Sequence, residues 1–193
     1  MKLIAITGVI GCGKSVVAHM VKIMGYEVYD CDSRAKALMI NDPEVKKQLT
    51  MAFGEQTYLD DGTLNRQHLS DLAFTDSNAL VCINGIVHPA TARDLQRWAD
   101  SQARRGAKLA FVETALLRTA GLDRVVDSVW HVTAPTDIRI RRVMTRSGLT
   151  AQQVKDRIAA QVAEDNLATG EHAIINDNTT ALLPQVLQLL IQE

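Results

Sequence analysis

The sequence predicts an α/β protein with a parallel, five-stranded sheet that carries helices on both faces. Short apolar runs alternate along the chain with longer runs in which apolar residues recur at helical spacing. The short runs contain few polar residues, as is typical of parallel strands buried on both faces. A glycine-rich turn separates the first short run from the first helical one. Ligands of such sheets bind at the carboxyl ends of the strands, so we expect the site there.

Five segments are expected to form the strands. Each is short, mostly apolar and bounded by polar or helical sequence, which favours a buried strand. They are KLIAIT (2–7), EVYD (27–30), KLAFVE (108–113), DSVWHVT (127–133) and HAIIN (172–176).

Helical patterns follow the first two strands. SVVAHMVKIM (15–24) comes after the glycine turn, and Asp42 before Pro43 predicts the N-cap and first turn of a helix over 43–53. From 63 to 105 the pattern is helical, with one interruption expected at 87–89 because the residue before Pro89 disfavours the helical region. This block is too long for a simple crossover, so we expect it to form a cap beside the sheet.

Three more helices are expected in the second half of the chain. Pro135 begins one that ends at about residue 146. Thr150 and Gln153 form a capping box for the next, which is expected to end at about residue 163. The closing helix covers 180–191, where Pro184 must lie in the first turn or break the helix.

Composition limits the class of protein and its partners. At 193 residues, with 47% apolar and 22% charged residues, the chain is typical of a soluble globular domain. A formal charge of −1 provides no basic field for nucleic acid. Cys12, Cys31 and Cys82 suit neither a disulfide framework nor a metal site, and no apolar run approaches the ~18 residues of a membrane span. We therefore expect a cytoplasmic protein without nucleic-acid, membrane or obligate protein partners.

The turn after the first strand carries the strongest motif. Gly8 to Ser15 fits G-x-x-x-x-G-K-S/T, between a strand and a helix as the motif requires. Its backbone N–H groups and the helix N-terminus favour phosphate, Lys14 reaches the β- and γ-phosphates, and the Ser15 hydroxyl ligates Mg²⁺. The alternative is a glycine-rich turn with a chance lysine. The expected ATP-binding residues are Gly8, Gly11, Cys12, Gly13, Lys14, Ser15 and Val16.

Carboxylates follow the neighbouring predicted strands. Asp30 and Asp32 come after the second strand, and Glu113 ends the third. Phosphoryl transfer to an alcohol needs a carboxylate that orients the hydroxyl and accepts its proton. The alternative for Asp30 or Asp32 is a helix N-cap. Because the sequence contains no guanine-reading N/T-K-x-D motif, the set favours a small-molecule kinase over a GTPase.

An arginine-rich helix supplies cations. Arg139, Arg142 and Arg146 lie at i, i+3 and i+7, on one helix face. The helix follows the fourth strand, where small-molecule kinases place a lid that brings guanidinium groups onto the phosphates. The alternative is a solvated, salt-bridged surface. Lys14 and Arg142 are therefore candidate catalytic cations, and Arg142 and Arg146 candidate ATP ligands.

The ordered motifs resemble those of the dephospho-coenzyme A kinase family over nearly the whole chain. ITGVIGCGKSVVA is similar to the family's loop, and VYDCDSRAKAL to its strand followed by D-x-D. LNRQHLSDLAF and INGIVHP resemble its L-x-R-x-x-L segment and histidine–proline pair. ALLRTAGLD is similar to L-L-F-E-x-G-L-D, and RVMTRSGLTAQQVKDRIAAQ to the lid.

The resemblance implies a P-loop kinase that phosphorylates the ribose 3′-hydroxyl of dephospho-coenzyme A with ATP and Mg²⁺. Asp32 would be the base, Arg66 and His88 would bind the coenzyme, and Glu113 would lie at the substrate. One chain, residues 1–193, would hold three parts. They are a nucleotide-binding core (about 1–40, 106–136 and 170–193), a helical coenzyme-binding part (about 41–105) and a lid (about 137–169).

Six positions depart from the family's pattern and bear on affinity and rate. They are Val16 for a hydroxyl residue, Glu113 for aspartate, Ala115 for proline, Arg118 for phenylalanine, Thr119 for glutamate and Asn166 for lysine. Two alternatives remain: another small-molecule kinase, of the nucleoside or shikimate type, and a non-catalytic nucleotide-binding module. The first differs in the acceptor it uses, and the second would bind ATP without transferring phosphate.

Overall fold

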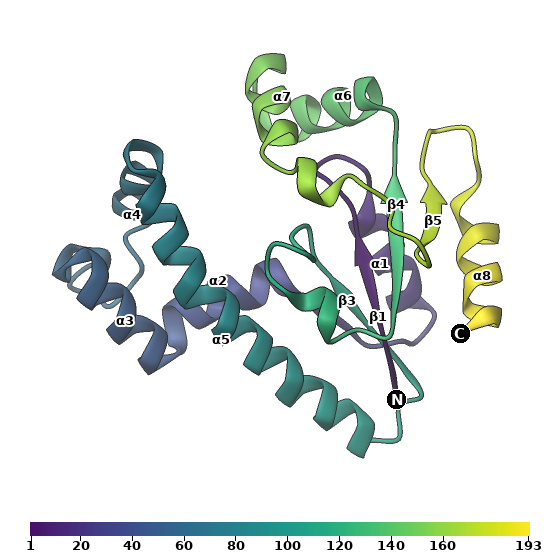
Figure 1. Cartoon of the computed structure of the whole chain (residues 1–193), viewed down its shortest axis with the longest axis horizontal. Helices are drawn as coiled ribbons and strands as arrows, with labels where there is room; N and C mark the ends of the chain where they lie inside the picture. Colours follow the sequence, from purple (N-terminus) through teal and green to yellow (C-terminus); the bar gives the residue numbers. More distant parts are fainter. The chain divides into compact units, whose positions relative to one another are not determined.

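A parallel sheet of five strands forms the centre of the chain's larger unit (Figure 1). The structure is a computed structural model that describes the backbone of residues 1–193 and every side chain except those of Phe74 and Ser77. The strand order is β2-β3-β1-β4-β5, and every pairing is parallel. The strands are β1 (Lys2–Thr7), β2 (Val28–Asp30), β3 (Leu109–Glu113), β4 (Ser128–Thr133) and β5 (His172–Ile175). The predicted parallel sheet is confirmed, with each strand within one residue of its expected bounds.

Two helices cover one face of this sheet with a continuous apolar core. They are α1 (Lys14–Ile23) and α8 (Leu182–Gln192), which contact each other. Phe111 and Trp130 place their ring centroids 5.1 Å apart at the centre of that core. In β1, β3 and β4 consecutive residues are buried, so the opposite face is covered as well. Pro184 is the third residue of α8, which confirms its place in the first turn.

Most of the remaining helices of the larger unit follow β4. They are α6 (Thr136–Ser147), α7 (Ala151–Ala159) and the short 3-10 helix η3 (Val162–Glu164), with a further 3-10 helix, η2 (Leu122–Arg124), before β4. Thr150 and Gln153 form the predicted capping box. The expected single helix to residue 163 is instead α7 followed by η3, which are separated at Ala160 and Gln161.

The chain divides into two compact units. One comprises residues 1–30 and 99–193, and the other residues 31–98. The smaller unit holds α2 (Cys31–Asn41), α3 (Pro43–Phe53), η1 (Glu55–Thr57), α4 (Arg66–Thr75) and most of α5 (Ser77–Arg104). Val45, Leu49 and Ala90 are its buried centre, and Asp42 caps α3 as predicted by accepting the N–H groups of Glu44 and Val45.

The predicted interruption at 87–89 is wrong, because α5 continues through Pro89. A proline removes one helical hydrogen bond, here to the carbonyl of Gly85, and both residues are exposed, so water can solvate that carbonyl. Val87 and Ala90 are buried on the other side and hold the helix together. The break lies instead at Asp76, which is extended (φ −134°, ψ 112°) and accepts the N–H of Asn78 at 2.8 Å. None of the helices described here is long and apolar enough to cross a membrane.

Candidate functional site

The predicted phosphate loop joins β1 to α1 and is packed tightly against two other segments. Gly11 and Gly13 have φ values of 81° and 94°, which favour glycine. A Cβ on Gly11 would lie 2.7 Å from the carbonyl oxygen of Arg139 in α6. A Cβ on Gly13 would collide with the side-chain amide of Asn176, which follows β5. The two glycines therefore provide both the turn and the close approach of neighbouring backbone.

A hollow of about 260 Å³ opens over this loop in the larger unit. It brings together five of the predicted loop residues and both predicted arginines of α6. Gly8 and Cys12 do not line it. Cys12 is fully buried, and burial raises the pKa of its thiol while Lys14 partly opposes the shift. The lining residues are Ile10, Gly11, Gly13, Lys14, Ser15, Val16, Arg142, Val143 and Arg146.

Arg142 holds the loop to the segment after β5. Its guanidinium donates to the carbonyl oxygens of Gly11 and Cys12 at 3.4 Å and to the carbonyl of Asn176 at 3.1 Å. It also donates to the side-chain oxygens of Asn176, at 3.0 Å, and Asn178. Neither asparagine was predicted from the sequence, because a single amide after a strand carries no pattern of its own. Arg142 is thus a half-buried structural contact as well as a lining residue.

Arg139, the first arginine of the same predicted face, is only 6% exposed. It donates to both carboxylate oxygens of Asp165 at 3.2 Å and to the hydroxyl of Thr136 at 2.9 Å. These bonds use both Nη atoms of its guanidinium, and Arg139 does not line the hollow. The solvated-surface interpretation is therefore wrong for Arg139, which is a buried structural residue. Arg146 is exposed at the hollow's edge.

Carboxylates lie at the carboxyl edge of the sheet, where the loop begins. Asp30 and Glu113 are register partners in β2 and β3, and Glu113 is also the partner of Ile6 in β1. Asp32 lies two residues after β2, as the second residue of α2 rather than the residue before it. It therefore occupies the first turn, where a negative charge is favoured by the helix dipole, instead of the N-cap position.

The other predicted substrate residues belong to the smaller unit. Arg66 is the first residue of α4, which Asn65 caps by accepting the N–H of His68 at 3.1 Å. His88 is half-buried in α5, and this burial lowers the pKa of its imidazole. Asp32 belongs to this unit as well. The structure thus places Asp32, Arg66 and His88 in one unit, and the loop, Glu113, Arg142 and Arg146 in the other.

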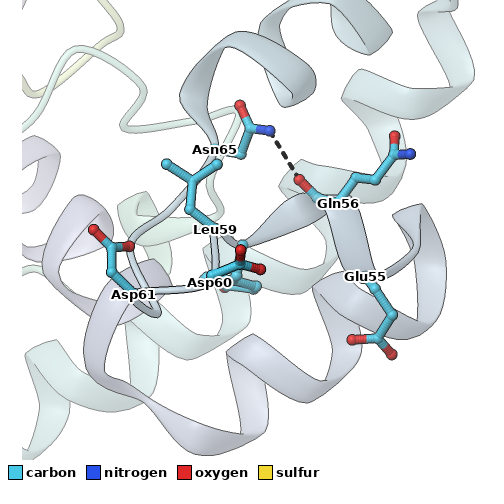
Figure 2. Close-up of a pocket in the computed structure, with 7 residues that line it drawn as sticks. Glu55, Gln56, Leu59, Asp60, Asp61 and Asn65 are labelled. Carbon is cyan, nitrogen blue, oxygen red and sulfur yellow. Dashed lines mark hydrogen bonds between the residues drawn. The ribbon is translucent and has the colours of Figure 1, made fainter.

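The smaller unit also has an open hollow of about 600 Å³ (Figure 2). None of the predicted site residues lines it. Its carboxylates, on Glu55, Asp60 and Asp61, do not converge on one point, so they do not form a cation site (Figure 2). Their negative charge also disfavours a phosphate group there. Its lining residues are Glu55, Gln56, Tyr58, Leu59, Asp60, Asp61 and Asn65.

Two of the six residues that depart from the family's pattern, Arg118 and Thr119, form hydrogen bonds with a buried carboxylate. Glu164 is fully buried and accepts the backbone N–H groups of Arg118 at 3.1 Å and Thr119 at 2.8 Å. The Arg118 guanidinium donates to Glu171 at 2.5 Å, and Glu171 lies 3.6 Å from Nδ1 of buried His131. At position 119, where the family's pattern has glutamate, Thr119 donates its N–H and its hydroxyl to the carboxylate of Glu164 in η3. Of the others, Ala115 is buried, and Val16 and Asn166 are exposed.

Comparison with known proteins gives a consistent set of relatives. A sequence model described as dephospho-CoA kinase matches residues 2–182. A curated dephospho-CoA kinase from Porphyromonas gingivalis is 36% identical over 192 residues, which cover 98% of this chain and 93% of that protein. One from Geobacter sulfurreducens is 34% identical over 194 residues, covering 100% and 96%.

Solved structures with a similar fold include a dephospho-CoA kinase. A crystal structure from Thermus thermophilus matches with a TM-score of 0.79 and 33% identity, covering 99% of this chain and 95% of that chain. A dephospho-CoA kinase from Campylobacter jejuni has a TM-score of 0.73 at 20% identity, with 100% and 97% covered. A shikimate kinase from Bacteroides thetaiotaomicron shares the fold alone, at a TM-score of 0.55 and 12% identity, with 100% and 99% covered.

Proposed function

The chain belongs to the dephospho-coenzyme A kinase family, and we propose that its phosphate loop, its α6 arginines and Asp32 carry out that family's reaction. The γ-phosphoryl group of ATP is transferred to the ribose 3′-hydroxyl of dephospho-coenzyme A. The products are coenzyme A and ADP, and the reaction is the last step of coenzyme A synthesis. A likeness to shikimate kinases in fold alone does not favour the alternative acceptors.

The observation that carries the nucleotide site is the hollow in which loop residues and lid arginines meet. Inward N–H groups of a glycine-rich loop and the N-terminus of α1 favour phosphate oxygens, and Lys14 is the first residue of that helix. Arg142 and Arg146 line the same hollow and add positive charge. We assign the β- and γ-phosphates of ATP to this hollow, with residues 137–169 as the lid.

The remainder of ATP has room in a neighbouring hollow of about 460 Å³. Arg142 and Arg146 line both hollows, so the two are adjacent along α6. Its other lining residues come from α6 and from Asn178 in the turn after β5. We place the adenosine part of ATP here, with the α6 arginines between base and phosphates.

The donor set of the loop fits Mg²⁺ bound together with the nucleotide. Among the residues the structure describes, no three His, Cys, Asp or Glu side chains come together as a metal site of their own. Mg²⁺ characteristically takes one or two protein oxygens and completes its shell with phosphates and water. The Ser15 hydroxyl, which lines the hollow, would be the protein ligand, and Glu113 would bind water at the ion. When bound, Mg²⁺ neutralises charge on the β- and γ-phosphates.

The acceptor is assigned to the residues of the smaller unit. Asp32 would orient the ribose 3′-hydroxyl and take its proton, and Arg66 and His88 would bind the coenzyme, in the part formed by about residues 41–105. His88 suits neutral hydrogen bonding, because burial lowers the pKa of its imidazole. The three free cysteines suit a reducing compartment, so we place the enzyme in the cytoplasm.

An ADP-release assay with a panel of acceptors tests this function. We expect turnover with dephospho-coenzyme A and only background ATP hydrolysis with adenosine or shikimate. The product should carry a new phosphate on the ribose 3′-oxygen, which ³¹P NMR can locate. Transfer to adenosine or shikimate at a higher kcat/KM would instead indicate another small-molecule kinase. ATP binding without any transfer would indicate a non-catalytic module.

A further inference from the structure

We propose that Asn176 is a positioning residue that aims the N–H of Gly13 into the phosphate hollow by holding the preceding carbonyl. This inference rests on the proposed function, in which that hollow binds the phosphates of ATP. Asn176 does not line the hollow itself. Its effect passes through the peptide bond between Cys12 and Gly13.

Asn176 is fixed in place by the sheet. It directly follows β5, its backbone N–H donates to the carbonyl of Thr133 at 2.9 Å, and it is only 8% exposed. Its side-chain Nδ2 donates to the Cys12 carbonyl at 2.8 Å, and its Oδ1 accepts from Arg142 at 3.0 Å. The opposite orientation of the amide would set its NH₂ against the guanidinium and its oxygen against a carbonyl, so these two partners define the orientation.

The geometry of a peptide turns this contact into control of the loop. In a planar trans peptide the C=O and the following N–H point in opposite directions. No cis peptide bond occurs in the part of the chain that the structure describes, so a Cys12 carbonyl held toward Asn176 directs the Gly13 N–H to the other side. Gly13 lines the hollow and Cys12 does not, so we place the Gly13 N–H on the side of the hollow.

The peptide between Cys12 and Gly13 needs such an anchor because the backbone of glycine rotates more freely than that of other residues. Gly13 has φ 94°, in a region where only glycine moves freely, so its peptide has more than one accessible orientation. A rotated peptide would present the Cys12 carbonyl oxygen to the phosphates and repel them. The hydrogen bonds of α1 do not hold the Cys12 carbonyl. They begin at the next carbonyl, that of Gly13, which accepts the N–H of Val16 at 2.9 Å. Besides Asn176, the Cys12 carbonyl has the longer contact of 3.4 Å from Arg142.

Gln185 provides a matched control. Its side-chain amide makes two hydrogen bonds to the backbone of Ile175, the residue before Asn176, at 2.8 and 2.9 Å. It therefore holds the same segment of chain without contacting the loop. Gln185→Ala should loosen the end of β5 as much as a change at Asn176 does, and leave the Cys12–Gly13 peptide in place.

The test compares Asn176→Ala and Asn176→Asp with Gln185→Ala in the full chain. The aspartate keeps the shape and the bond from Arg142 but cannot donate to Cys12, so it guards against a failure of the alanine variant to fold. Isothermal calorimetry should show ADP and ATP binding weakened by about 10- to 100-fold in both Asn176 variants, the usual range for a lost hydrogen bond to a charged group. The KM for dephospho-coenzyme A, and ADP binding by Gln185→Ala, should stay within about twofold of the wild-type values.

The amide resonance of Gly13 reports the mechanism directly. In ¹H–¹⁵N spectra of the wild type it should move strongly on ADP binding, and in both Asn176 variants it should move little. A Gly13 resonance that moves equally in wild type and variants, or unchanged ADP affinity in folded Asn176→Asp, would overturn the role of Asn176 alone. If the chemical shift of the wild-type Gly13 amide does not change on ADP binding, the proposed nucleotide site itself is contradicted.

Discussion

Thr119 and Glu164, which lie 45 residues apart in the sequence, form a hydrogen-bonded pair in which both the backbone N–H and the hydroxyl of Thr119 donate to one carboxylate oxygen, at 2.8 and 2.7 Å. This pair joins the loop after β3 to η3. The neighbouring Gln161 accepts the N–H of Ile10 in the phosphate loop at 2.8 Å. The buried carboxylate thus helps to hold η3, which is part of the proposed lid (137–169), against the loop after β3.

We therefore predict that Thr119→Val lowers stability and leaves catalysis largely intact. Valine keeps the shape and the backbone bond and loses only the hydroxyl bond, so the free energy of unfolding should fall by about 1 kcal/mol. Glu164→Ala should cost more, about 3–5 kcal/mol, because it leaves Arg118 beside an empty buried site. Urea unfolding measures both values. A Thr119→Val protein of wild-type stability would show that the hydroxyl bond contributes nothing.

Acid should destabilise the protein through His131. Burial lowers the pKa of this imidazole below its usual value of 6.5, although Glu171 partly raises it. The unfolded chain therefore binds a proton at a pH where the folded chain does not, so stability falls as the pH falls below about 6.5. In His131→Gln the loss of stability between pH 7 and pH 5 should be smaller than in the wild type. Equal slopes in the two proteins would rule out this contribution.

Features that depend on neighbouring residues could be predicted from the sequence, whereas contacts between distant residues could not. The phosphate-loop match, the capping box at Thr150 and the N-cap at Asp42 depend on residues within one turn or loop, and their local patterns were sufficient. The interruption at Pro89 was wrong because burial of Val87 and Ala90 outweighs the local preference of a proline. Asn176 and Glu164 were missed because their partners lie 164 and 45 residues away, beyond any spacing rule.

Lys14→Ala should nearly abolish transfer in a folded protein. A cation placed against charge on the γ-phosphoryl group contributes about 3–4 kcal/mol to the barrier in comparable sites, which corresponds to a fall in kcat of about 10²- to 10³-fold. Circular dichroism and the urea midpoint should match those of the wild type. Lys22→Ala, in the last turn of the same helix, is the control and should keep full activity. Full activity of Lys14→Ala would contradict the phosphate-loop assignment.

Arg142→Ala should affect both nucleotide binding and stability. The sequence alone favoured a small effect on stability, but the guanidinium bonds to carbonyls of Gly11, Cys12 and Asn176. We expect a higher KM for ATP, a lower kcat and a loss of about 1–2 kcal/mol in the free energy of unfolding. Lys155→Ala, at an exposed position of α7, should change stability by less than about 0.5 kcal/mol. Unchanged kinetics in Arg142→Ala would leave the arginine a purely structural role.

Asp32→Asn tests the proposed base. Asparagine keeps the size and most of the hydrogen bonding of Asp32 but cannot accept a proton from the 3′-hydroxyl. General-base contributions are typically about 10²- to 10⁴-fold, so kcat should fall by that much. The affinity for ATP should barely change, because the proposed nucleotide ligands are the loop and the α6 arginines.

The position of Asp32 within α2 decides how the result is interpreted. Asp32 is the second residue of its helix, so loss of its charge weakens the interaction with the helix dipole by only about 0.3–1 kcal/mol. Glu44 is the second residue of α3, and Glu44→Gln removes the same charge from the same helical position. Both variants should lose similar stability, and only Asp32→Asn should lose turnover. If Asp32→Asn turns over dephospho-coenzyme A as fast as Glu44→Gln, the carboxylate serves the helix and another group accepts the proton.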